Sequence, residues 1–358
     1  MSTDPFTARP GAVGRPPAHY GNPLGEQRLL ASGEAIVDLS DRDVLSITGD
    51  DRRSWLDSLT SQSIARLAPG ESAETLLLDP SGRLEYAIRV IDDGETLWLL
   101  LDAGFGPGLL AFLERMRFML RVEVADRTAE FATVGTLGVL PPAIAAPGGV
   151  PLVWNDPWRA VVAGGHQYAT VAEHPGLEWS YAEALVPRDR LGELAELPAA
   201  GTLALEALRI AAWRPRAATE VDATTIPHEL DWLRSAVHLT KGCYRGQETV
   251  AKVHNLGHPP RRLVMLHLDG SEGAQLAAGD EVTLDGTVVG RVTAAGLHHE
   301  LGPIALAVIK RSADSTADLA VHAADGTAVA AAQQVVVPTD AGAEANVPRL
   351  PRLGAVKR

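Results

Sequence analysis

The sequence predicts an α+β fold with three structured parts. Strand-like runs alternate with amphipathic helical patterns over residues 25–130 and again over residues 131–260, whereas residues 261–338 carry almost only strand-like runs. At about 150 residues per domain, a chain of 358 residues has room for two or three domains. We therefore expect a first α+β domain at 25–130, a second at 131–260 and a small C-terminal β-barrel at 261–338.

The first domain opens with a strand-like segment at residues 36–45 that Gly49 closes. Trp55, Leu56 and Leu59 then share one face of a helix expected over residues 52–59. The turn sequences DPSG and DDG separate the next runs. We expect strands at 75–78, 83–91 and 95–101, followed by a helix at 107–120 and a strand at 121–124. The pattern indicates an antiparallel sheet with helices on one face.

The second domain and the barrel are predicted from shorter patterns. In the second domain we expect strands at 131–139, 159–164 and 168–173, and helices at 189–197 and 202–213. In the barrel, Gly and Asp separate the apolar runs at short intervals. The expected barrel strands are 262–268, 281–286, 287–296, 305–311 and 333–338.

The two ends of the chain lack apolar periodicity. Residues 1–24 are rich in Pro and Gly, and residues 339–358 are rich in Ala, Gly and Pro. We expect a disordered lead-in and a disordered tail.

Composition excludes several classes of function. The net charge of −13 argues against a protein held on nucleic acid or on an anionic membrane. The single cysteine, Cys243, excludes an internal disulfide framework and any metal site with two thiolates, and we expect no metal site. No apolar run approaches the ~20 residues of a membrane span. Sparing use of cysteine is typical of a reducing compartment, so we expect a cytoplasmic protein.

One segment, residues 240–251, combines several reactive features. Cys243 lies between Lys241 and Arg245, in a loop with Gly242 and Gly246, just before a helical pattern. Two cations and a helix start stabilise a thiolate, and glycines let backbone amides approach an anion. Two structural alternatives remain open: the cysteine is a small buried apolar residue, or the glycines only form a tight turn.

The eight residues Lys241–Glu248, KGCYRGQE, resemble the signature of the YgfZ-type folate-binding proteins. These are relatives of the aminomethyltransferase (T-protein) of the glycine cleavage system and are linked to iron–sulfur cluster assembly and repair. The resemblance extends upstream to LRIAAWRP and IPHELDWL, and downstream to GRVTAAGLHHELGPIALAVIKR. It implies two ferredoxin-like layers closed into a ring by the barrel.

The resemblance also implies that tetrahydrofolate, or a one-carbon derivative, binds in the opening of the ring. Cys243 and Lys241 are then the catalytic candidates. The candidates for binding the folate are Lys241, Tyr244, Arg245, Gln247, Glu248 and Glu229. Cations suit the glutamate tail of a folate, and acids or amides suit the edge of its pterin ring.

One departure from the family of aminomethyltransferases bears on function. Those enzymes carry an acidic pair where this chain has Tyr86 and Ala87, and the nearest acid, Glu85, is one position away. Neighbouring strand residues point to opposite faces, so Glu85 does not replace the missing acid. The leading hypothesis is therefore a tetrahydrofolate-binding accessory factor for iron–sulfur proteins or their assembly machinery, and not a stand-alone aminomethyltransferase. The alternatives are a folate-dependent one-carbon transferase or demethylase, and a folate-binding module without chemistry of its own.

Overall fold

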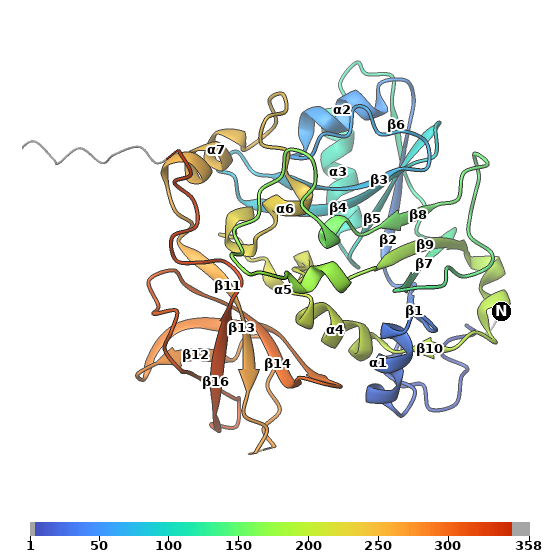
Figure 1. Cartoon of the computed structure of the whole chain (residues 1–358). Helices are drawn as coiled ribbons and strands as arrows, with labels where there is room; N and C mark the ends of the chain where they lie inside the picture. Colours follow the sequence, from blue (N-terminus) through green and yellow to red (C-terminus); the bar gives the residue numbers. More distant parts are fainter. Residues whose placement is uncertain (1–3, 272, 346–358) are drawn as a thin grey trace, which may run out of the picture.

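Two β-sheets and a C-terminal barrel surround a common centre in the computed structural model, which describes residues 4–271 and 273–345 (Figure 1). The sheets lie in the upper and right-hand part of Figure 1, and the barrel lies at the lower left. The largest core cluster joins all three parts, because it includes Leu76 of the first sheet, Leu185 of the second and Met265 of the barrel. The predicted α+β class with a C-terminal barrel is confirmed.

The first sheet is antiparallel throughout, with the order β3-β4-β5-β2-β6. Its strands are β2 (Asp43–Thr48), β3 (Ser72–Leu78), β4 (Leu84–Asp92), β5 (Thr96–Leu101) and β6 (Glu123–Asp126). Helices α2 (Arg52–Leu59) and α3 (Gly106–Met116) cover one face, where Leu56 and Leu109 join a core cluster with Leu45 and Leu99. The other face points toward the second sheet.

Helix α3 is shorter than the sequence predicts. Four apolar residues recur at spacings of three and four over 107–120, which predicts that they share the inner face of the helix. Leu109 and Leu113 are buried, but Met116 and Leu120 are 44% and 40% exposed. Residues 117–120 leave the helix, and Met119 adopts a left-handed conformation at φ 56°. The apolar spacing therefore continues past the point where the core ends.

The second sheet has the order β10-β1-β7-β9-β8, and only the pair β1–β10 is parallel. Its strands are β1 (Ile36–Leu39), β7 (Phe131–Thr136), β8 (Val153–Asn155), β9 (Ala182–Pro187) and β10 (Ala199–Ala200). Strand β1 thus belongs to the second sheet although it precedes the whole first sheet. The segment expected at 36–45 is two strands, β1 and β2, and the chain passes from one sheet to the other at Ser40–Arg42. This crossing brings Arg42 to the boundary between the sheets.

The strands expected at 159–164 and 168–173 are absent from the structure, although both segments lie within the described residues. Their backbone groups bond to the segment around η4 (Pro227–Leu230) and α6 (Leu233–Ala236) instead of a sheet. The Val162 amide donates to the Arg234 carbonyl at 2.9 Å, and the Tyr168 amide donates to the Asp231 carboxylate at 2.6 Å. The helices of this half are α4 (Thr202–Ala211), α5 (Ala217–Glu220), α6 (Leu233–Ala236) and α7 (Gln247–Leu256), with 3-10 turns η1 (Pro157–Arg159), η2 (Pro175–Glu178), η3 (Arg188–Leu194) and η4 (Pro227–Leu230).

Residues 261–337 form a closed six-stranded barrel in the order β11-β14-β13-β12-β15-β16. Its strands are β11 (Arg261–Leu268), β12 (Glu281–Leu284), β13 (Thr287–His298), β14 (Gly302–Lys310), β15 (Leu319–His322) and β16 (Ala328–Val335). Strands β11, β12, β13 and β14 lie close to the expected runs, whereas β16 begins five residues before the run expected at 333–338. The short strand β15 was not predicted, because four residues between turns carry little alternation.

The N-terminal segment differs from the loose lead-in that the sequence predicts. Phe6 is fully buried against the outer face of the second sheet, and Arg9 donates to the carbonyls of Leu194 and Leu197 at 2.8 and 2.6 Å. Helix α1 (Pro23–Ala31) follows and packs on α4. One buried aromatic ring and a few backbone bonds are enough to order a segment that has no apolar period.

The C-terminal segment is described as far as residue 345. The amides of Glu344 and Ala345 donate to the carbonyls of His254 and Asn255 at 2.9 and 3.2 Å, so this part of the expected tail caps the end of α7. Residues 346–358 of the expected tail, like residues 1–3 of the lead-in, lie outside the described residues. Across the part of the chain that is described, no helix combines the length and apolar character needed to cross a bilayer.

Candidate ligand-binding site

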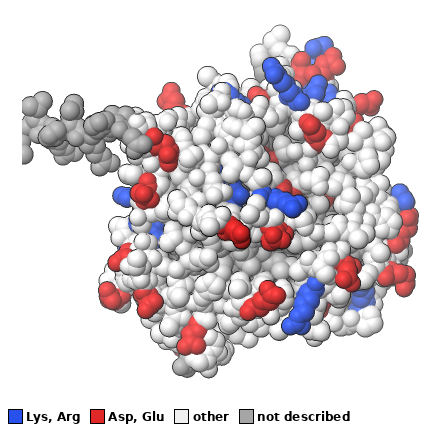
Figure 2. All heavy atoms as spheres, viewed as in Figure 1, with Lys and Arg blue, Asp and Glu red and all other residues white. Residues whose placement is uncertain are grey.

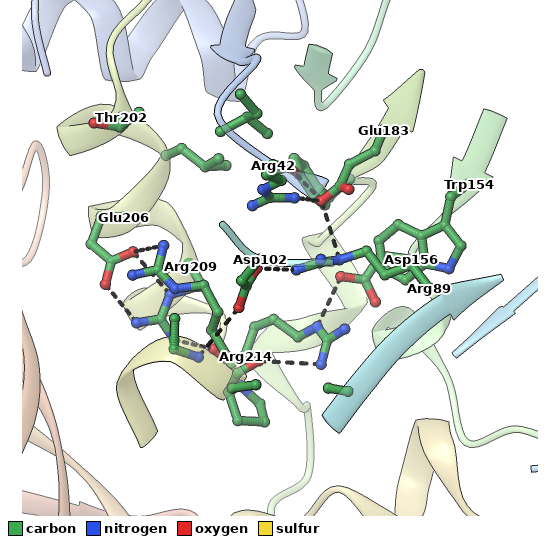
Figure 3. A pocket seen from close by; sticks show the side chains of 18 of the residues that line it. Arg42, Arg89, Asp102, Trp154, Asp156, Glu183, Thr202, Glu206, Arg209 and Arg214 are labelled. Atoms are coloured by element: carbon green, nitrogen blue, oxygen red, sulfur yellow. Dashed lines mark hydrogen bonds and ion pairs between the residues drawn. The ribbon is translucent and has the colours of Figure 1, made fainter. Parts of the chain in front are cut away.

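A cavity of about 310 Å³ lies where the two sheets meet helix α4 and the segment that follows it (Figure 3). Its volume falls in the range of about 300–1,000 Å³ that is typical of small-molecule sites. Aromatic and charged side chains dominate the wall. The aromatic ones are Trp154, Trp179, Tyr181 and Trp232, the basic ones Arg42, Arg89, Arg209, Arg214 and Arg216, and the acidic ones Asp41, Glu74, Asp102, Asp156, Glu183 and Glu206. We call this the central cavity.

Glu183, on strand β9, is wholly buried at the wall of the central cavity. Its Oε1 atom accepts a hydrogen bond from the Tyr181 hydroxyl at 2.9 Å, pairs with Arg42, and lies 3.3 Å from Nε of Arg89 (Figure 3). Burial raises the pKa of Glu183, but Arg42 and Arg89 outweigh burial, so the net pKa is lowered. Glu183 is therefore a carboxylate at neutral pH.

Two polar atoms beside this cluster have no protein partner. Oε2 of Glu183 and Nη1 of Arg89 are both buried and make no hydrogen bond within the described structure. An unsatisfied buried polar group costs about 1–3 kcal/mol, and more when it is charged. Because both residues line the cavity, a ligand that reaches these covered atoms would supply the missing donor and acceptor.

Arg214 joins the two sheets at the floor of the cavity. Its Nη2 donates to Glu74 of β3 at 2.6 Å, and its Nε donates to Asp156 at 2.8 Å. The guanidinium lies 5.3 Å from the ring of Trp158 and 5.7 Å from that of Trp232. Because its guanidinium already pairs with two acids and lies against two rings, Arg214 holds the cavity wall in place and is less available to pair with a charged ligand.

The side of the cavity formed by α4 carries a second charged cluster. Arg209 pairs with Glu206 at 2.6 Å and with Glu220 at 2.8 Å, and Asp102 pairs with Arg89 at 2.9 Å (Figure 3). Burial raises the pKa of Asp102 and of Glu206, but the neighbouring arginines lower both on balance. Both acids are therefore carboxylates that accept hydrogen bonds and hold no proton for transfer.

The aromatic side chains offer flat faces to a ligand. Trp179 and Tyr181 are stacked, with centroids 5.1 Å apart and planes at 30°, and Trp154 meets Tyr181 edge-on at 6.4 Å. The Trp232 indole N–H donates to Glu74 at 3.0 Å, which locks the orientation of that ring. Rigid aromatic walls with a few charged atoms suit a planar, polar heterocycle.

Lys241, expected in the binding and catalytic machinery, ties the signature loop to helix α2. Its Nζ donates to the carbonyls of Asp57, Thr60 and Gln62 at 2.6, 2.9 and 2.8 Å and lies 3.2 Å from the Asp57 carboxylate. The side chain is 3% exposed, and burial lowers its pKa although Asp57 opposes the shift. All the donors of the ammonium group are thus directed at protein oxygens.

Cys243 is exposed in the loop that Lys241 anchors. On the far side of the loop, Arg245 pairs with Glu85 at 2.7 Å. Gly246, at φ 85°, allows close packing there, because a Cβ would lie 2.7 Å from the carbonyl oxygen of Asp79. The loop is therefore held at both ends, with its thiol facing solvent.

The four other binding candidates lie near the loop or the barrel. Tyr244 is buried and its hydroxyl has no partner in the described structure, and Gln247 donates to the Lys241 carbonyl at 3.3 Å. Glu248 is exposed in the first turn of α7. Glu229 is wholly buried and pairs with Arg261 of β11 at 2.8 Å, so it fastens turn η4 to the barrel.

None of the seven candidate residues, all within the described range, is among those that line the central cavity. The structure groups Lys241, Cys243, Tyr244, Arg245, Gln247 and Glu248 in and beside one loop, and it separates Glu229 from them. Within the described residues, no three His, Cys, Asp or Glu side chains form a group suited to a metal ion.

The two positions at which the resemblance implies an acidic pair in a transferase, Tyr86 and Ala87, line different spaces. Ala87 of β4 lines the central cavity, whereas Tyr86 and Glu85 line a separate groove.

The residues that sequence reasoning missed are the cavity charges, above all Glu183, Arg89 and Arg214. Each belongs to a different segment, so no motif links them. A usable signal existed in β9, where Glu183 interrupts an apolar strand, since a charge at an inward position needs a buried partner.

Comparison with known proteins agrees with this architecture. Residues 261–339 match the family described as the glycine cleavage T-protein C-terminal barrel domain. An aminomethyltransferase from Herpetosiphon aurantiacus is 25% identical over 334 residues, covering 87% of this chain and 90% of that protein. These matches support a place in the glycine cleavage T-protein superfamily.

Two further relatives define the range of the similarity. A putative chloroplastic transferase from Arabidopsis thaliana is 26% identical over 304 residues, covering 79% of this chain and 67% of that protein. The crystal structure of the glycine cleavage system aminomethyltransferase T from Bartonella henselae superposes with a TM-score of 0.69 over 90% of this chain and 91% of that one, at 17% identity. The superposition shows that the fold is shared.

Proposed function

We propose that the central cavity binds a tetrahydrofolate. The observation that carries the proposal is the pair of unpartnered buried atoms, Oε2 of Glu183 and Nη1 of Arg89, in a cavity with aromatic walls. A reduced pterin presents N–H donors and a carbonyl acceptor along one edge, and it has a flat body. A carboxylate beside a guanidinium complements that edge, and the tryptophan and tyrosine rings complement the faces. Similarity to aminomethyltransferases supports the same ligand.

Titration of tryptophan fluorescence with tetrahydrofolate tests this proposal, because three tryptophans line the cavity. We expect saturable binding by the wild-type protein and a loss of about 100-fold or more in Glu183→Gln, since a charged hydrogen-bond partner is removed. Glu193→Gln is the matched control, because Glu193 also pairs with an arginine but lies on the surface. Equal affinities of the wild type and Glu183→Gln would contradict the proposal. Thermal unfolding of both variants shows whether each remains folded.

We further propose that the folate-binding protein is a cytoplasmic accessory factor for iron–sulfur cluster assembly or repair, of the YgfZ type. Two features support this: the KGCYRGQE signature, and the exposure of Cys243 on a loop separate from the cavity lining. In this view the thiol faces a partner protein while folate occupies the interior. One thiolate cannot hold a cluster alone, so any cluster contact is shared with the partner. The separation of loop and cavity predicts that Cys243→Ser retains folate binding but loses the accessory function.

A folate-dependent transferase or demethylase is the second candidate, favoured by similarity to aminomethyltransferases over most of the chain. The cavity gives it less support, because Ala87, at one of the two positions where the resemblance implies an acid in a transferase, is apolar, and because Asp102, Glu183 and Glu206 are each engaged with arginines. Incubating the protein with tetrahydrofolate and a small aminomethyl donor, whose carbon is already at the oxidation level of formaldehyde, and assaying methylenetetrahydrofolate and the released amine, separates the two functions. Sustained turnover would establish the enzyme.

A further inference from the structure

A recess of about 370 Å³ lies on the outer side of the second sheet, next to the central cavity. Its walls come from the N-terminal segment, from β1 with the loop that follows it, and from turn η3. Pro16 and Asp41 line both the recess and the central cavity, so the two spaces adjoin. We call this space the outer recess. The segment that the sequence predicts to be a disordered lead-in therefore forms one of its walls.

Asp38 of β1 is the most deeply buried charged residue of the outer recess. Ile36, two positions earlier on the strand, joins the apolar cluster around Phe6 on the outer face of the sheet, so Asp38 points to the same face. Asp38 is only 2% exposed. Its Oδ1 accepts a hydrogen bond from the Ser40 amide at 3.0 Å, whereas its Oδ2 is buried and makes no hydrogen bond within the described structure. One carboxylate oxygen thus lacks a donor.

The charge of Asp38 also has no compensating cation. Burial raises the pKa of Asp38 to about 6, the charges of Asp4 and Asp41 add to this rise, and hydrogen bonds from Ser40 oppose it. Asp38 forms no ion pair with any described residue. Above pH 7 it is therefore a buried carboxylate without a partner of opposite charge. An ammonium group would stabilise it, because such a group brings a positive charge and N–H donors together.

The two arginines of the outer recess differ in how they are held. Arg188 donates from Nε to the Thr128 carbonyl at 2.8 Å and from Nη2 to the Ser40 carbonyl at 2.7 Å, so much of its guanidinium is occupied. Arg15 is exposed and makes no hydrogen bond or ion pair with a described residue. The outer recess therefore has an unpaired acid inside it and an unpaired cation at its edge.

The remaining walls limit the chemistry of a ligand. Pro5, Pro16 and Leu191 give the outer recess apolar surface. Its acids are not arranged for a metal ion, since no three His, Cys, Asp or Glu side chains among the described residues form such a group. Its volume is that of a small-molecule site. The lining thus fits a small organic molecule with an apolar body, an ammonium group and an anionic group.

We propose that the outer recess binds a small aliphatic α-amino acid, with the ammonium group at Oδ2 of Asp38 and the carboxylate at Arg15. The apolar side chain of the ligand then lies against Pro5, Pro16 and Leu191. The ammonium group gives Asp38 the donor that the protein lacks, and the charge pair at the edge favours a zwitterion over a simple amine. This site is distinct from the central cavity and does not depend on a folate there.

Isothermal titration calorimetry on the full chain at pH 8 tests the site with three probes that share one carbon skeleton. L-Valine carries both charges, isobutylamine lacks the carboxylate, and isovalerate lacks the amine. We expect saturable binding of L-valine and no detectable binding of isovalerate, which Asp38 repels. Isobutylamine should bind about threefold more weakly than L-valine, since an exposed charge pair contributes little.

Replacing Asp38 tests the inner contact. Asp38→Asn keeps an acceptor for the Ser40 amide but removes the charge, so it should weaken L-valine binding at least about tenfold. Asp231→Asn is the matched control and should leave the affinity unchanged. Asp231 is likewise buried, accepts a backbone amide and has an unpartnered Oδ2, but it does not line the outer recess. Thermal unfolding shows that each variant is folded.

Replacing Arg15 tests the contact at the edge. Arg15→Ala should weaken binding of L-valine about threefold and leave that of isobutylamine unchanged, because only L-valine has a carboxylate. Arg28→Ala is the control, since Arg28 is also exposed and lies outside the lining of the outer recess.

The outcomes are decisive for this site alone. Absence of saturable L-valine binding to the folded wild type would overturn the proposal, and so would equal affinity for L-valine and isovalerate. Unchanged affinity in Asp38→Asn would also overturn it. An equal effect of Arg15→Ala on L-valine and isobutylamine would show that Arg15 does not receive the carboxylate. None of the probes is a folate, so these results leave the proposed folate cavity to its own test.

Discussion

The central cavity and the signature loop, residues 241–248, use charged residues in opposite ways. In the cavity, charges from both sheets converge, and two buried polar atoms are left without a protein partner. In the loop, the Lys241 ammonium is directed at three carbonyls and Arg245 pairs with Glu85. Figure 2 shows the surface consequence, since acidic and basic side chains lie side by side near the middle of this face and form no large basic patch. A conspicuous sequence motif can thus serve to hold a loop, while the ligand site is assembled from residues far apart in the chain.

The largest expected effect on stability is that of Lys241→Met. Removing the ammonium leaves three carbonyls without this donor and Oδ2 of Asp57 without its cation, while Oδ1 still accepts from the backbone, so we expect a loss of about 2–4 kcal/mol in the free energy of unfolding. Tetrahydrofolate affinity of the folded protein should change by less than about twofold, since Lys241 does not line the cavity. Denaturant unfolding and the fluorescence titration measure the two quantities. Lys252→Met is the control, because Lys252 is exposed. A tenfold loss of tetrahydrofolate affinity in Lys241→Met would show that the signature loop contributes to ligand binding.

A smaller effect on stability is expected when Asp231, which precedes the cavity residue Trp232, is replaced by Asn. Burial raises the pKa of Asp231 to about 7, against the hydrogen bond from the Tyr168 amide and the charge of Arg234. Because the folded protein holds this proton more tightly than the unfolded chain, the contribution of Asp231 to stability falls as pH rises from about 4 to 7. Asn keeps the acceptor and suits the left-handed conformation at φ 54°.

Asp231→Asn should therefore raise the melting temperature by about 3 °C at alkaline pH, and by progressively less toward pH 4. Calorimetry of both proteins across this range measures the difference. A gain that is constant with pH would show that Asp231 does not titrate in this window. If the variant binds folate as the wild type does, Asp231 affects stability without affecting the central cavity.

The smallest physical effect is expected for Cys243→Ser. The side chain is exposed, so the free energy of unfolding should change by less than about 0.5 kcal/mol. Tetrahydrofolate affinity should also be unchanged. The activity of iron–sulfur enzymes in a strain that lacks the protein should be restored by the wild type and not by the variant. Full restoration by Cys243→Ser would remove the thiol from the proposed accessory function and leave the loop with a structural role only.

Sequence patterns predicted much of the fold because buried apolar residues recur at a regular spacing along each helix and strand. Leu109 and Leu113 recur at helical spacing, and the strands of the first sheet lie close to the expected ranges. The same reasoning was less successful where the backbone bonds to side chains or loops, as at Val162 and Tyr168. It also could not show that β1 pairs with β7, because strand order depends on contacts between residues about 100 positions apart.

The sequence by itself determined the α+β class, the barrel and the position of the loop around Cys243, since each depends on local period or local composition. Only the tertiary structure decided where the cavity that is the candidate ligand-binding site lies. Glu183 and Arg89 are 94 residues apart and belong to different sheets, and they meet because the two sheets pack against each other through a shared core. A buried charge is stable only beside its partner, and no short-range pattern in a chain records which distant residue that partner will be.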